Sequence, residues 1–260
     1  MRPELRTPLN NNVWTTKDRP PGLPDGMRIY AIGDIHGRVD LLDQLLTLIE
    51  ADIARYPIVR PVSVFLGDYI DRGPSSRETV DRLIEHDARL ESVFLKGNHE
   101  VIALNCLSDR NSFEHWLRLG GRETLISYKL APELIENRKR TAETQLAFHN
   151  AIPPRHFRFF RNMSASFSCG DFFFVHAGVR PGIDLSDQAE ADLLWIRNEF
   201  LSSQHDFGKI IIHGHTPTRQ VDVRSNRINI DTGAFGTGCL TCLIVEGASL
   251  WTIDTRANAQ

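Results

Sequence analysis

Long apolar runs are missing from this sequence of 260 residues, and cysteine is scarce. No window approaches the roughly 20 apolar residues of a transmembrane helix, and the first residues lack the apolar core of a signal peptide. The 4 cysteines are too few for a disulfide framework in a chain of this length. We therefore expect a cytoplasmic protein without a membrane partner.

Net charge is also small, because 30 Lys and Arg residues oppose 33 Asp and Glu residues and leave a formal charge of -3. A balance this close to neutral provides no overall attraction for nucleic acid, so we expect no nucleic-acid partner. Hydrophobic residues at 41% and charged residues at 24% are typical of a globular protein with an ample core. Nothing in the composition indicates an oligomeric state.

Three sequence signatures of phosphate chemistry are absent as well. No Cys is followed six positions later by Arg, which excludes the cysteine-phosphatase loop. No two Asp residues stand two positions apart, which excludes the pattern of an aspartyl-phosphate nucleophile. No G-x-x-x-x-G-K-[ST] stretch occurs, which excludes a nucleotide-binding P-loop.

From Arg28 onward, short apolar runs alternate with helical patterns, which is typical of an α/β domain. The expected strands span residues 29–32, 62–66, 93–95, 172–175, 210–212, 228–230 and 240–245. Apolar residues at helical spacing predict helices over residues 41–49 and 76–90. We interpret residues 1–27 as an irregular leader, residues 28–260 as one domain, and residues 100–160 approximately as an inserted helical cap.

Five of the expected strands are followed at once by a cluster of Gly, Asp, Asn or His residues. These clusters are Gly33-Asp34-Ile35-His36-Gly37, Gly67-Asp68-Tyr69-Ile70-Asp71-Arg72-Gly73, Gly97-Asn98-His99-Glu100, His176-Ala177-Gly178 and His213-Gly214-His215-Thr216. In α/β folds, ligands bind beyond the carboxyl ends of strands, where loops from several strands converge. We therefore expect the five clusters to meet at one site.

The residue types in these clusters indicate a metal site. Carboxylate oxygen, amide oxygen and imidazole nitrogen without thiolate suit Mn, Fe or Zn rather than a structural zinc site built on cysteine. Asp34 and His36 are two positions apart, so both side chains project to one side of an extended segment. A carboxylate such as Asp68 can bridge two cations, and two metals roughly 3.5 to 4 Å apart clamp the entering and leaving oxygens of an in-line displacement.

In this combination the sequence resembles the calcineurin-like metallophosphoesterases, and within them the phosphoprotein phosphatase branch that includes small bacterial and phage enzymes. The family pattern is G-D-x-H-G, G-D-x-x-D-R-G, G-N-H-E, a lone His after a strand, and G-H-T. Every element occurs here in order over about residues 28–235. The resemblance implies two mixed β-sheets packed as a sandwich and flanked by helices, with the metals at one edge.

The resemblance also implies a role for each matched residue. It implies two divalent metal ions, with Mn²⁺ expected first and Fe or Zn as alternatives. One metal would be held by Asp34, His36 and Asp68, and the other by Asp68, Asn98, His176 and His215. His99 would be the general acid, oriented by Asp71, while Arg72 and Arg197 (after Leu194-Trp195-Ile196) would bind phosphate oxygens. Fork-shaped cations at these positions also agree with the needs of a transferred phosphoryl group.

The implied activity is hydrolysis of phosphomonoesters by in-line attack of a metal-bridging hydroxide. The expected substrate is a phosphorylated protein, with Ser or Thr favoured and Tyr as an option, or a small phosphoester. The alternative is a hydrolase of dinucleoside polyphosphates such as diadenosine tetraphosphate. Enzymes of that type tend to lack the second Asp of G-D-x-x-D-R-G and to carry Asp after G-N-H, so Asp71 and Glu100 favour the phosphoprotein substrate. A metal-stabilised binding module without activity would lack a ligand or His99, and none is missing.

Three remaining features are interpreted as structural. Arg155, Arg158 and Arg161 alternate with phenylalanines and are expected as solvated arginines on a loop or edge strand. Cys239 and Cys242 form a lone C-x-x-C in a strand-like setting, so we expect neither zinc nor redox chemistry there. His213 is expected to support the site rather than bind metal, because the G-H-T pattern selects His215.

Overall fold

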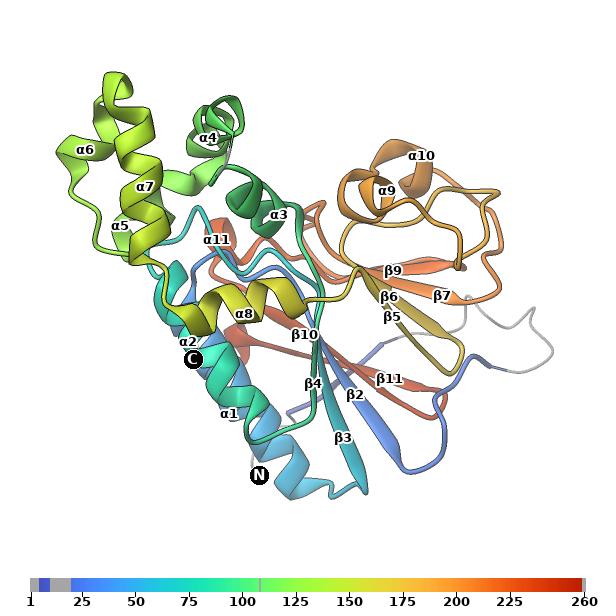
Figure 1. The fold of residues 1–260 in the computed structure, drawn as a ribbon. Helices are drawn as coiled ribbons and strands as arrows, with labels where there is room; N and C mark the ends of the chain where they lie inside the picture. The colour runs from blue at the N-terminus through green and yellow to red at the C-terminus, as the bar shows by residue number, and fades with distance from the viewer. Residues whose placement is uncertain (1–4, 10–19, 108, 259–260) are drawn as a thin grey trace.

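The computed structural model describes residues 5–9, 20–107 and 109–258, and Figure 1 shows two β-sheets with helices around them. The first sheet has the strand order β1-β11-β10-β2-β3-β4, and the second has the order β5-β6-β7-β9-β8. The strands of the first sheet are Thr7–Pro8 (β1), Ser249–Asp254 (β11), Thr241–Glu246 (β10), Met27–Ile32 (β2), Arg60–Phe65 (β3) and Ser92–Phe94 (β4). Those of the second are Ser166–Cys169 (β5), Phe172–Val175 (β6), Ile210–His213 (β7), Arg227–Asn229 (β9) and Asp222–Val223 (β8). Strands β2, β3 and β4 run parallel, as do β6, β7 and β9, and the remaining pairs are antiparallel.

Both faces of the first sheet are apolar because each face packs against a separate part of the hydrophobic core. Ile29 and Ala31 of β2 pack with Phe174 and Ile212 of the second sheet. Their neighbour Tyr30 belongs to a different cluster, which contains apolar residues of the helices. Because successive side chains of a strand point to opposite faces, an unbroken apolar run marks a strand that is covered on both sides. The predicted α/β class, with two mixed sheets packed together and flanked by helices, is confirmed.

Helices cover the outer faces and form the cap. Helix α1 (Val39–Arg55) contains the first predicted helix, and α2 (Ser76–Asp87) begins where the second was predicted and ends three residues before residue 90. Helix α9 (Glu190–Trp195) and the short α10 (Asn198–Leu201) pack on the second sheet. Between β4 and β5 the chain forms α3 (Asn98–Asn105), α4 (Arg110–Trp116), the π-helical η2 (Leu117–Gly121), α5 (Arg122–Ser127), α6 (Pro132–Glu136), the 3-10 turn η3 (Arg138–Arg140), α7 (Thr141–Ala151) and α8 (Pro154–Asn162). Two short elements follow the second sheet: α11 (Ala234–Thr237) and η4 (Thr255–Asn258).

The run from Arg155 to Arg161 differs from expectation, because it lies on α8 rather than on a loop or edge strand. Pro154 stands at the start of this helix, where a proline costs nothing because the first N–H groups of a helix have no partner within it. Pro154 is therefore compatible with a helix that begins at this residue. The arginines do stay exposed, and Arg155 pairs with Asp81 of α2.

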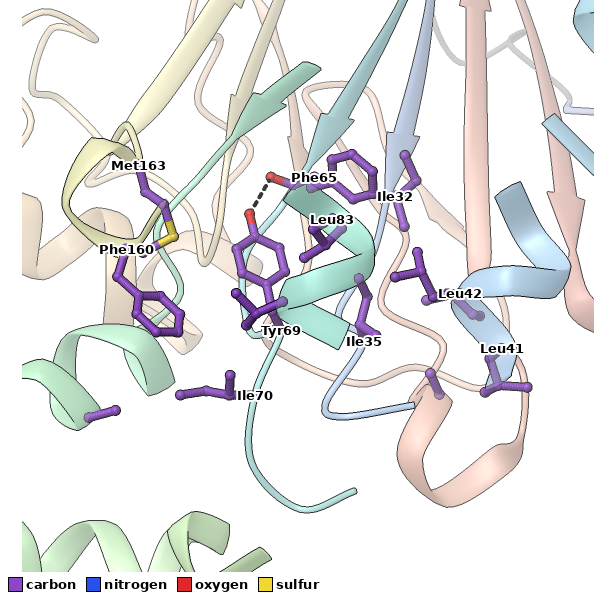
Figure 2. Close-up of a cluster of buried hydrophobic side chains, with 14 of the residues drawn as sticks. Ile32, Ile35, Leu41, Leu42, Phe65, Tyr69, Ile70, Leu83, Phe160 and Met163 are labelled. Atoms are coloured by element: carbon purple, nitrogen blue, oxygen red, sulfur yellow. Dashed lines mark hydrogen bonds between the residues drawn. The ribbon is translucent and has the colours of Figure 1, made fainter. Parts of the chain in front are cut away.

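Apolar residues between the polar ones anchor the loops after β2 and β3. Ile35, Tyr69 and Ile70 are almost fully buried in the core that α1 and α2 cover. Figure 2 shows Tyr69 and Ile35 inside this core, with the Tyr69 hydroxyl donating to the Phe65 carbonyl at 3.1 Å. The same hydroxyl lies 2.6 Å from the Leu95 carbonyl. Burying the apolar member of each motif fixes the direction of its polar neighbours.

A network of buried charges fixes the N-terminal segment at the other end of β2. The guanidinium of Arg6 donates to both carboxylate oxygens of Asp52, at 2.5 and 2.8 Å, and the Tyr30 hydroxyl donates to the same carboxylate at 2.6 Å. Strand β1, which falls within the predicted leader, adds to the edge of β11. The division into leader and domain stays a prediction.

All four cysteines are free thiols, and Cys239 and Cys242 are buried beside and within β10. Within the described ranges, no helix has both the length and the apolar character that a membrane span needs.

Candidate metal centre

Three parallel strands of the first sheet (β2, β3 and β4) and three of the second (β6, β7 and β9) end near one another, and a polar loop follows each. The loops after β2, β3 and β4 carry Asp34, Asp68 and Asn98, while those after β6 and β7 carry His176 and His215. Direct hydrogen bonds join the two sheets here. The His215 N–H donates to Asp34 Oδ2 at 3.1 Å, and His176 Nδ1 donates to the Leu66 carbonyl at 2.8 Å. The structure therefore brings the five sequence clusters together at the carboxyl ends of the strands.

Asp68 lies between two groups of side chains that could each hold a metal ion. The first consists of His36, Asp68 and His99, and the second of Asp68, His176 and His215, with the ligand atoms of each group within 4.8 Å of one another. His36 Nε2 lies 3.5 Å from Asp68 Oδ2, whereas His176 Nε2 lies 3.4 Å from Asp68 Oδ1. Each oxygen of this carboxylate thus faces a different group, which is the arrangement that a bridging ligand requires.

Backbone carbonyls fix the tautomers of two histidines. The Nδ1–H of His36 donates to the Ile70 carbonyl at 2.9 Å, as that of His176 does to Leu66. Burial lowers the pKa of His36 to about 3 and also lowers the pKa of His176, so both rings are neutral. Each ring therefore directs an Nε2 lone pair into the centre, and this is the form in which imidazole binds a metal.

Several polar atoms in and beside the second group lack a suitable partner without a cation. His176 Nε2 lies 3.0 Å from Asn98 Oδ1, and with the His176 proton on Nδ1 neither atom carries a hydrogen. His215 Nε2 is buried and has no hydrogen-bond partner in the described part of the chain. Because buried polar groups in native proteins are nearly always satisfied, these facing lone pairs fit a bound cation.

Crowded carboxylates give the same indication. Burial and the nearby carboxylates of Asp231 and Asp68 raise the pKa of Asp34 well above its ordinary value. Burial also raises the pKa of Asp231 to about 6. Negative groups held together away from water are stabilised by a metal ion, which is often the largest local charge in such a site. Asp34 itself is not a member of either group of three, and its place in the first group is taken by His99.

Asp231 was missed by the sequence analysis. It follows Ile230 at the end of β9, so the segment Asp231-Thr232-Gly233 is a sixth polar cluster after an apolar run. Its carboxylate accepts the N–H of Gly233 at 2.9 Å and is almost fully buried. The rule that found the other five clusters would have found this one had it been applied to the strand over residues 228–230. His213, in contrast, lies on β7 outside both metal-binding groups.

His99 and Asp71 form a buried pair beside the first group. His99 Nδ1 donates to Asp71 Oδ2 at 2.7 Å, and both side chains are at most 1% exposed. Burial opposes protonation of this ring, but the carboxylates of Asp68 and Asp71 outweigh it and raise the pKa of His99. The opposite nitrogen, His99 Nε2, lies 3.8 Å from Asp68 Oδ2 and so faces the centre.

Both predicted phosphate-binding arginines lie at the metal centre. The Arg72 guanidinium donates to His36 Nε2 at 3.0 Å and to His99 Nε2 at 3.1 Å. Arg197 is exposed at the rim, where it donates to the Thr216 hydroxyl at 3.2 Å. Two cationic forks, one inside the centre and one at its edge, can bind an anion that has several oxygens.

Glu100 has a supporting role that its place in the G-N-H-E motif did not reveal. Its carboxylate accepts the backbone N–H groups of Asp68 and Gly97 through one oxygen, and those of Tyr69 and Ile70 through the other, at 2.8 to 3.2 Å. These bonds hold the loop that carries Asp68. With four backbone donors, the carboxylate faces the loop and not the centre.

Comparisons with known proteins give the family of the chain. Residues 27–236 match the family model described as calcineurin-like phosphoesterase. A curated relative from Anoxybacillus flavithermus, bis(5'-nucleosyl)-tetraphosphatase PrpE [asymmetrical], is 27% identical over 231 residues, covering 82% of this chain and 88% of that protein. Serine/threonine-protein phosphatase 2 of Escherichia coli is 28% identical over 223 residues, covering 82% and 90%.

The solved structures agree on the fold. A crystal structure described as a putative diadenosine tetraphosphatase superimposes with a TM-score of 0.59 at 17% identity, covering 88% of this chain and 94% of the other. At this identity the likeness concerns the fold and not the substrate.

Proposed function

Because the chain belongs to the calcineurin-like phosphoesterase family, we propose that it hydrolyses phosphomonoesters of proteins with the help of two divalent metal ions. The metallophosphoesterase assignment follows from the family, whereas the phosphoprotein substrate and Mn²⁺ as the metal are our proposal. The observation that carries the proposal is the buried pair of His99 and Asp71, with its second imidazole nitrogen facing the metal centre.

The ligand assignment uses the two oxygens of Asp68. Asp34, His36 and Asp68 would hold one ion, and Asp68, Asn98, His176 and His215 the other. When bound, two such ions acidify a water molecule and neutralise charge on the phosphate.

Arg72 occupies the place that we assign to the phosphate. Its two donor nitrogens now contact His36 and His99, which offer neutral lone pairs. A phosphate offers a charge-assisted, bidentate partner, so the guanidinium turns to it and frees His99 Nε2. Arg197 binds a further phosphate oxygen from the rim. As the water oxygen forms its bond to phosphorus, the ester P–O bond breaks in line with it.

His99 supplies the proton that the leaving oxygen needs. A serine or threonine alkoxide is a poor leaving group, so its departure gains from a positioned acid. Once Arg72 no longer donates to Nε2, the raised pKa of His99 favours the protonated form, with Nδ1–H on Asp71 and Nε2–H toward the ester oxygen. A dinucleoside polyphosphate loses a stabilised phosphate anion, which needs such help less. The complete His99–Asp71 pair therefore supports a phosphomonoester with an alkoxide leaving group.

One observation favours the second candidate, a dinucleoside polyphosphate hydrolase. Several curated relatives that cover most of this chain are named bis(5'-nucleosyl)-tetraphosphatase. The protein phosphatase from Escherichia coli covers a similar share of the chain. In addition, the carboxylate of Glu100 is bound by backbone N–H groups and does not face the centre, so it does not itself select a substrate. The substrate argument thus rests on Asp71 alone.

A substrate panel with Mn²⁺ tests the proposal. Phosphoserine, phosphothreonine and phosphotyrosine peptides, p-nitrophenyl phosphate and diadenosine tetraphosphate are compared at matched concentration. We expect a phosphopeptide to give a higher kcat/KM than the dinucleotide. A kcat/KM for diadenosine tetraphosphate about a hundredfold above that of every phosphopeptide, a difference of about 2.7 kcal/mol in the barrier, would establish the second candidate instead.

A further inference from the structure

We infer that Trp116 and Thr124 of the helical cap are positioning residues, which hold the Asp71 carboxylate and through it align the His99 imidazole for proton transfer. The inference rests on the proposed function, because it assigns His99 the role of acid. It adds that the cap, which carries none of the other assigned groups beyond its first turn, is part of the proton-transfer apparatus.

The Asp71 carboxylate receives three donors and no solvent. Its Oδ2 accepts from His99 Nδ1 and from Trp116 Nε1, both at 2.7 Å, and its Oδ1 accepts from the Thr124 hydroxyl at 2.6 Å. All four side chains are at most 1% exposed. In a buried network of this kind the partners fix the orientation of each member, because no water can replace a lost bond. The plane of the carboxylate, and hence the direction of the His99 ring, depends on both cap residues.

The same cap segment supports the backbone of Asp71 and Arg72. Both residues have left-handed backbone angles, with φ of 71° and 67°, which cost roughly 1 kcal/mol or more for each residue with a side chain. The Asp71 N–H donates to Thr124 Oγ1 at 3.0 Å, and the Arg72 N–H donates to the Gly120 carbonyl at 3.2 Å. These bonds offset the strain at the two residues that we assign to proton delivery and phosphate binding.

Gly120 and Gly121 allow the cap to come this close. A Cβ atom on Gly120 would lie 2.7 Å from the Arg72 nitrogen, and one on Gly121 would lie 2.4 Å from the Trp116 ring. The indole in turn packs on Phe148, with ring centroids 5.1 Å apart. The aim of the Trp116 N–H is therefore set by the cap core.

The chemistry of the two donors suits positioning rather than proton transfer. An indole N–H donates and cannot accept, so Trp116 orients Asp71 without competing for the proton of His99. Thr124 accepts the Asp71 N–H while its own hydroxyl proton is directed to Oδ1. Removing either donor should leave the metal ligands in place and change the alignment of His99.

The test compares Trp116→Phe with Phe148→Leu, using a phosphoserine peptide and p-nitrophenyl phosphate as substrates of the Mn²⁺-loaded protein. Trp116→Phe removes the N–H and keeps most of the ring, whereas Phe148→Leu disturbs the same packing and leaves the hydrogen bond to Asp71 intact. We expect Trp116→Phe to lower kcat for the phosphoserine peptide by roughly 10-fold, as for one hydrogen bond to a charged group. Hydrolysis of p-nitrophenyl phosphate, whose leaving group needs no acid, should change by less than about 3-fold. Phe148→Leu should change both substrates by the same factor.

A double-mutant cycle checks that Trp116 acts through Asp71. In an Asp71→Asn background, adding Trp116→Phe should have an effect of less than about 2-fold, because the interaction that it removes is already lost. If Trp116→Phe slows both substrates equally, or if its effect is undiminished in Asp71→Asn, the residue only supports the fold and the inference is wrong. Thr124→Val against Thr124→Ser provides the same comparison should Trp116→Phe not fold, and the Ser variant should restore the wild-type ratio between the substrates.

A measurement without substrate separates this inference from the proposed function. The indole ¹H–¹⁵N signal of Trp116, identified by its loss in Trp116→Phe, should move in Asp71→Asn. An unmoved signal would refute the coupling even in an active enzyme. Conversely, a wild-type protein that cleaves no phosphomonoester, but whose Trp116 signal responds to Asp71, would refute the proposed substrate and keep the contact.

Discussion

The loops after the parallel strands direct their polar side chains toward the metal centre, whereas the buried side chains of the helical cap are mainly apolar and pack into a core. Backbone geometry follows the same division. Six described residues other than glycine have positive φ, and five of them, His36, Asp68, Asp71, Arg72 and His215, lie in the strand-end loops. Strained backbone is therefore concentrated where the chemistry is expected. Thr124 and Gly120 show that the cap accepts hydrogen bonds from part of that strained backbone.

Among the strand-end loops, we expect the largest loss of activity when Asp68, the carboxylate shared by both metal groups, is changed. Asp68→Asn should lower kcat/KM by more than about 10²-fold and reduce metal content at both positions, because each oxygen of Asp68 faces a different group. Even residues that stand behind metal ligands typically contribute 10- to 100-fold. Elemental analysis of the purified protein together with steady-state kinetics provides the measurement.

Asp52→Asn is the matched control, since Asp52 is another buried carboxylate but lies in the Arg6 network at the other end of β2. It should lower the free energy of unfolding by roughly 3 kcal/mol, as breaking a buried ion pair does, and leave kcat/KM unchanged. Normal metal content in Asp68→Asn would remove the bridging assignment.

His99→Asn should separate two substrates rather than abolish all activity. We expect hydrolysis of a phosphoserine peptide to fall by roughly 10² to 10⁴-fold, the usual contribution of a general acid. p-Nitrophenyl phosphate should be affected much less, because nitrophenols have a pKa below that of a tyrosine phenol, which is about 10, and leave without a proton. A leaving-group series measures the difference, under conditions where chemistry limits the rate. An equal loss for both substrates would show that His99 contacts phosphate or water instead.

Substitution of the two arginines tests whether a phosphate contact at the rim contributes as much to kcat/KM as one inside the metal centre. Replacing Arg72 or Arg197 by Ala should lower kcat/KM by roughly 10²-fold, because each guanidinium binds oxygens whose charge changes in the transition state. Metal content should remain normal in both variants. Arg197→Ala with wild-type kinetics would show that the exposed arginine does not bind phosphate.

A substitution in the helical cap should have the smallest effect on kcat/KM. Gly120→Ala forces a Cβ atom against the Arg72 backbone, and a displacement of the strained loop should lower kcat/KM by roughly 10-fold. Gly208→Ala is its control, because Gly208 also has a positive φ, of 74°, but no atom lies within 4 Å of its added Cβ. If both variants behave alike in kinetics, the loss comes from backbone strain in general and not from the contact between the cap and Arg72.

Sequence reasoning succeeded where a residue is chemically out of place. A carboxylate or imidazole directly after an apolar strand stands out, and this identified Asp34, Asp68, His176 and His215 as residues that the fold brings together. Their roles as ligands remain proposals. Asp231 also follows an apolar strand directly, so the same rule could have identified it from the sequence.

Other features leave no local signal. Trp116 and Thr124 look like ordinary members of a helical pattern, and their contacts with Asp71 span 45 and 53 residues of sequence. No periodicity or composition predicts such a pairing. Strand β11 was missed because tertiary packing decides its structure. The loop or edge strand expected for the arginine run was wrong because Pro154 starts helix α8 there.

Titration of metal-free protein with Mn²⁺ tests the central claim most directly. Hydrolysis of p-nitrophenyl phosphate and bound metal are followed together as metal is added. We predict that activity is absent without metal and reaches its plateau when two ions are bound per chain, one on each side of Asp68. Full activity in protein that contains no divalent metal, or a plateau at a single ion with no further binding, would contradict the account.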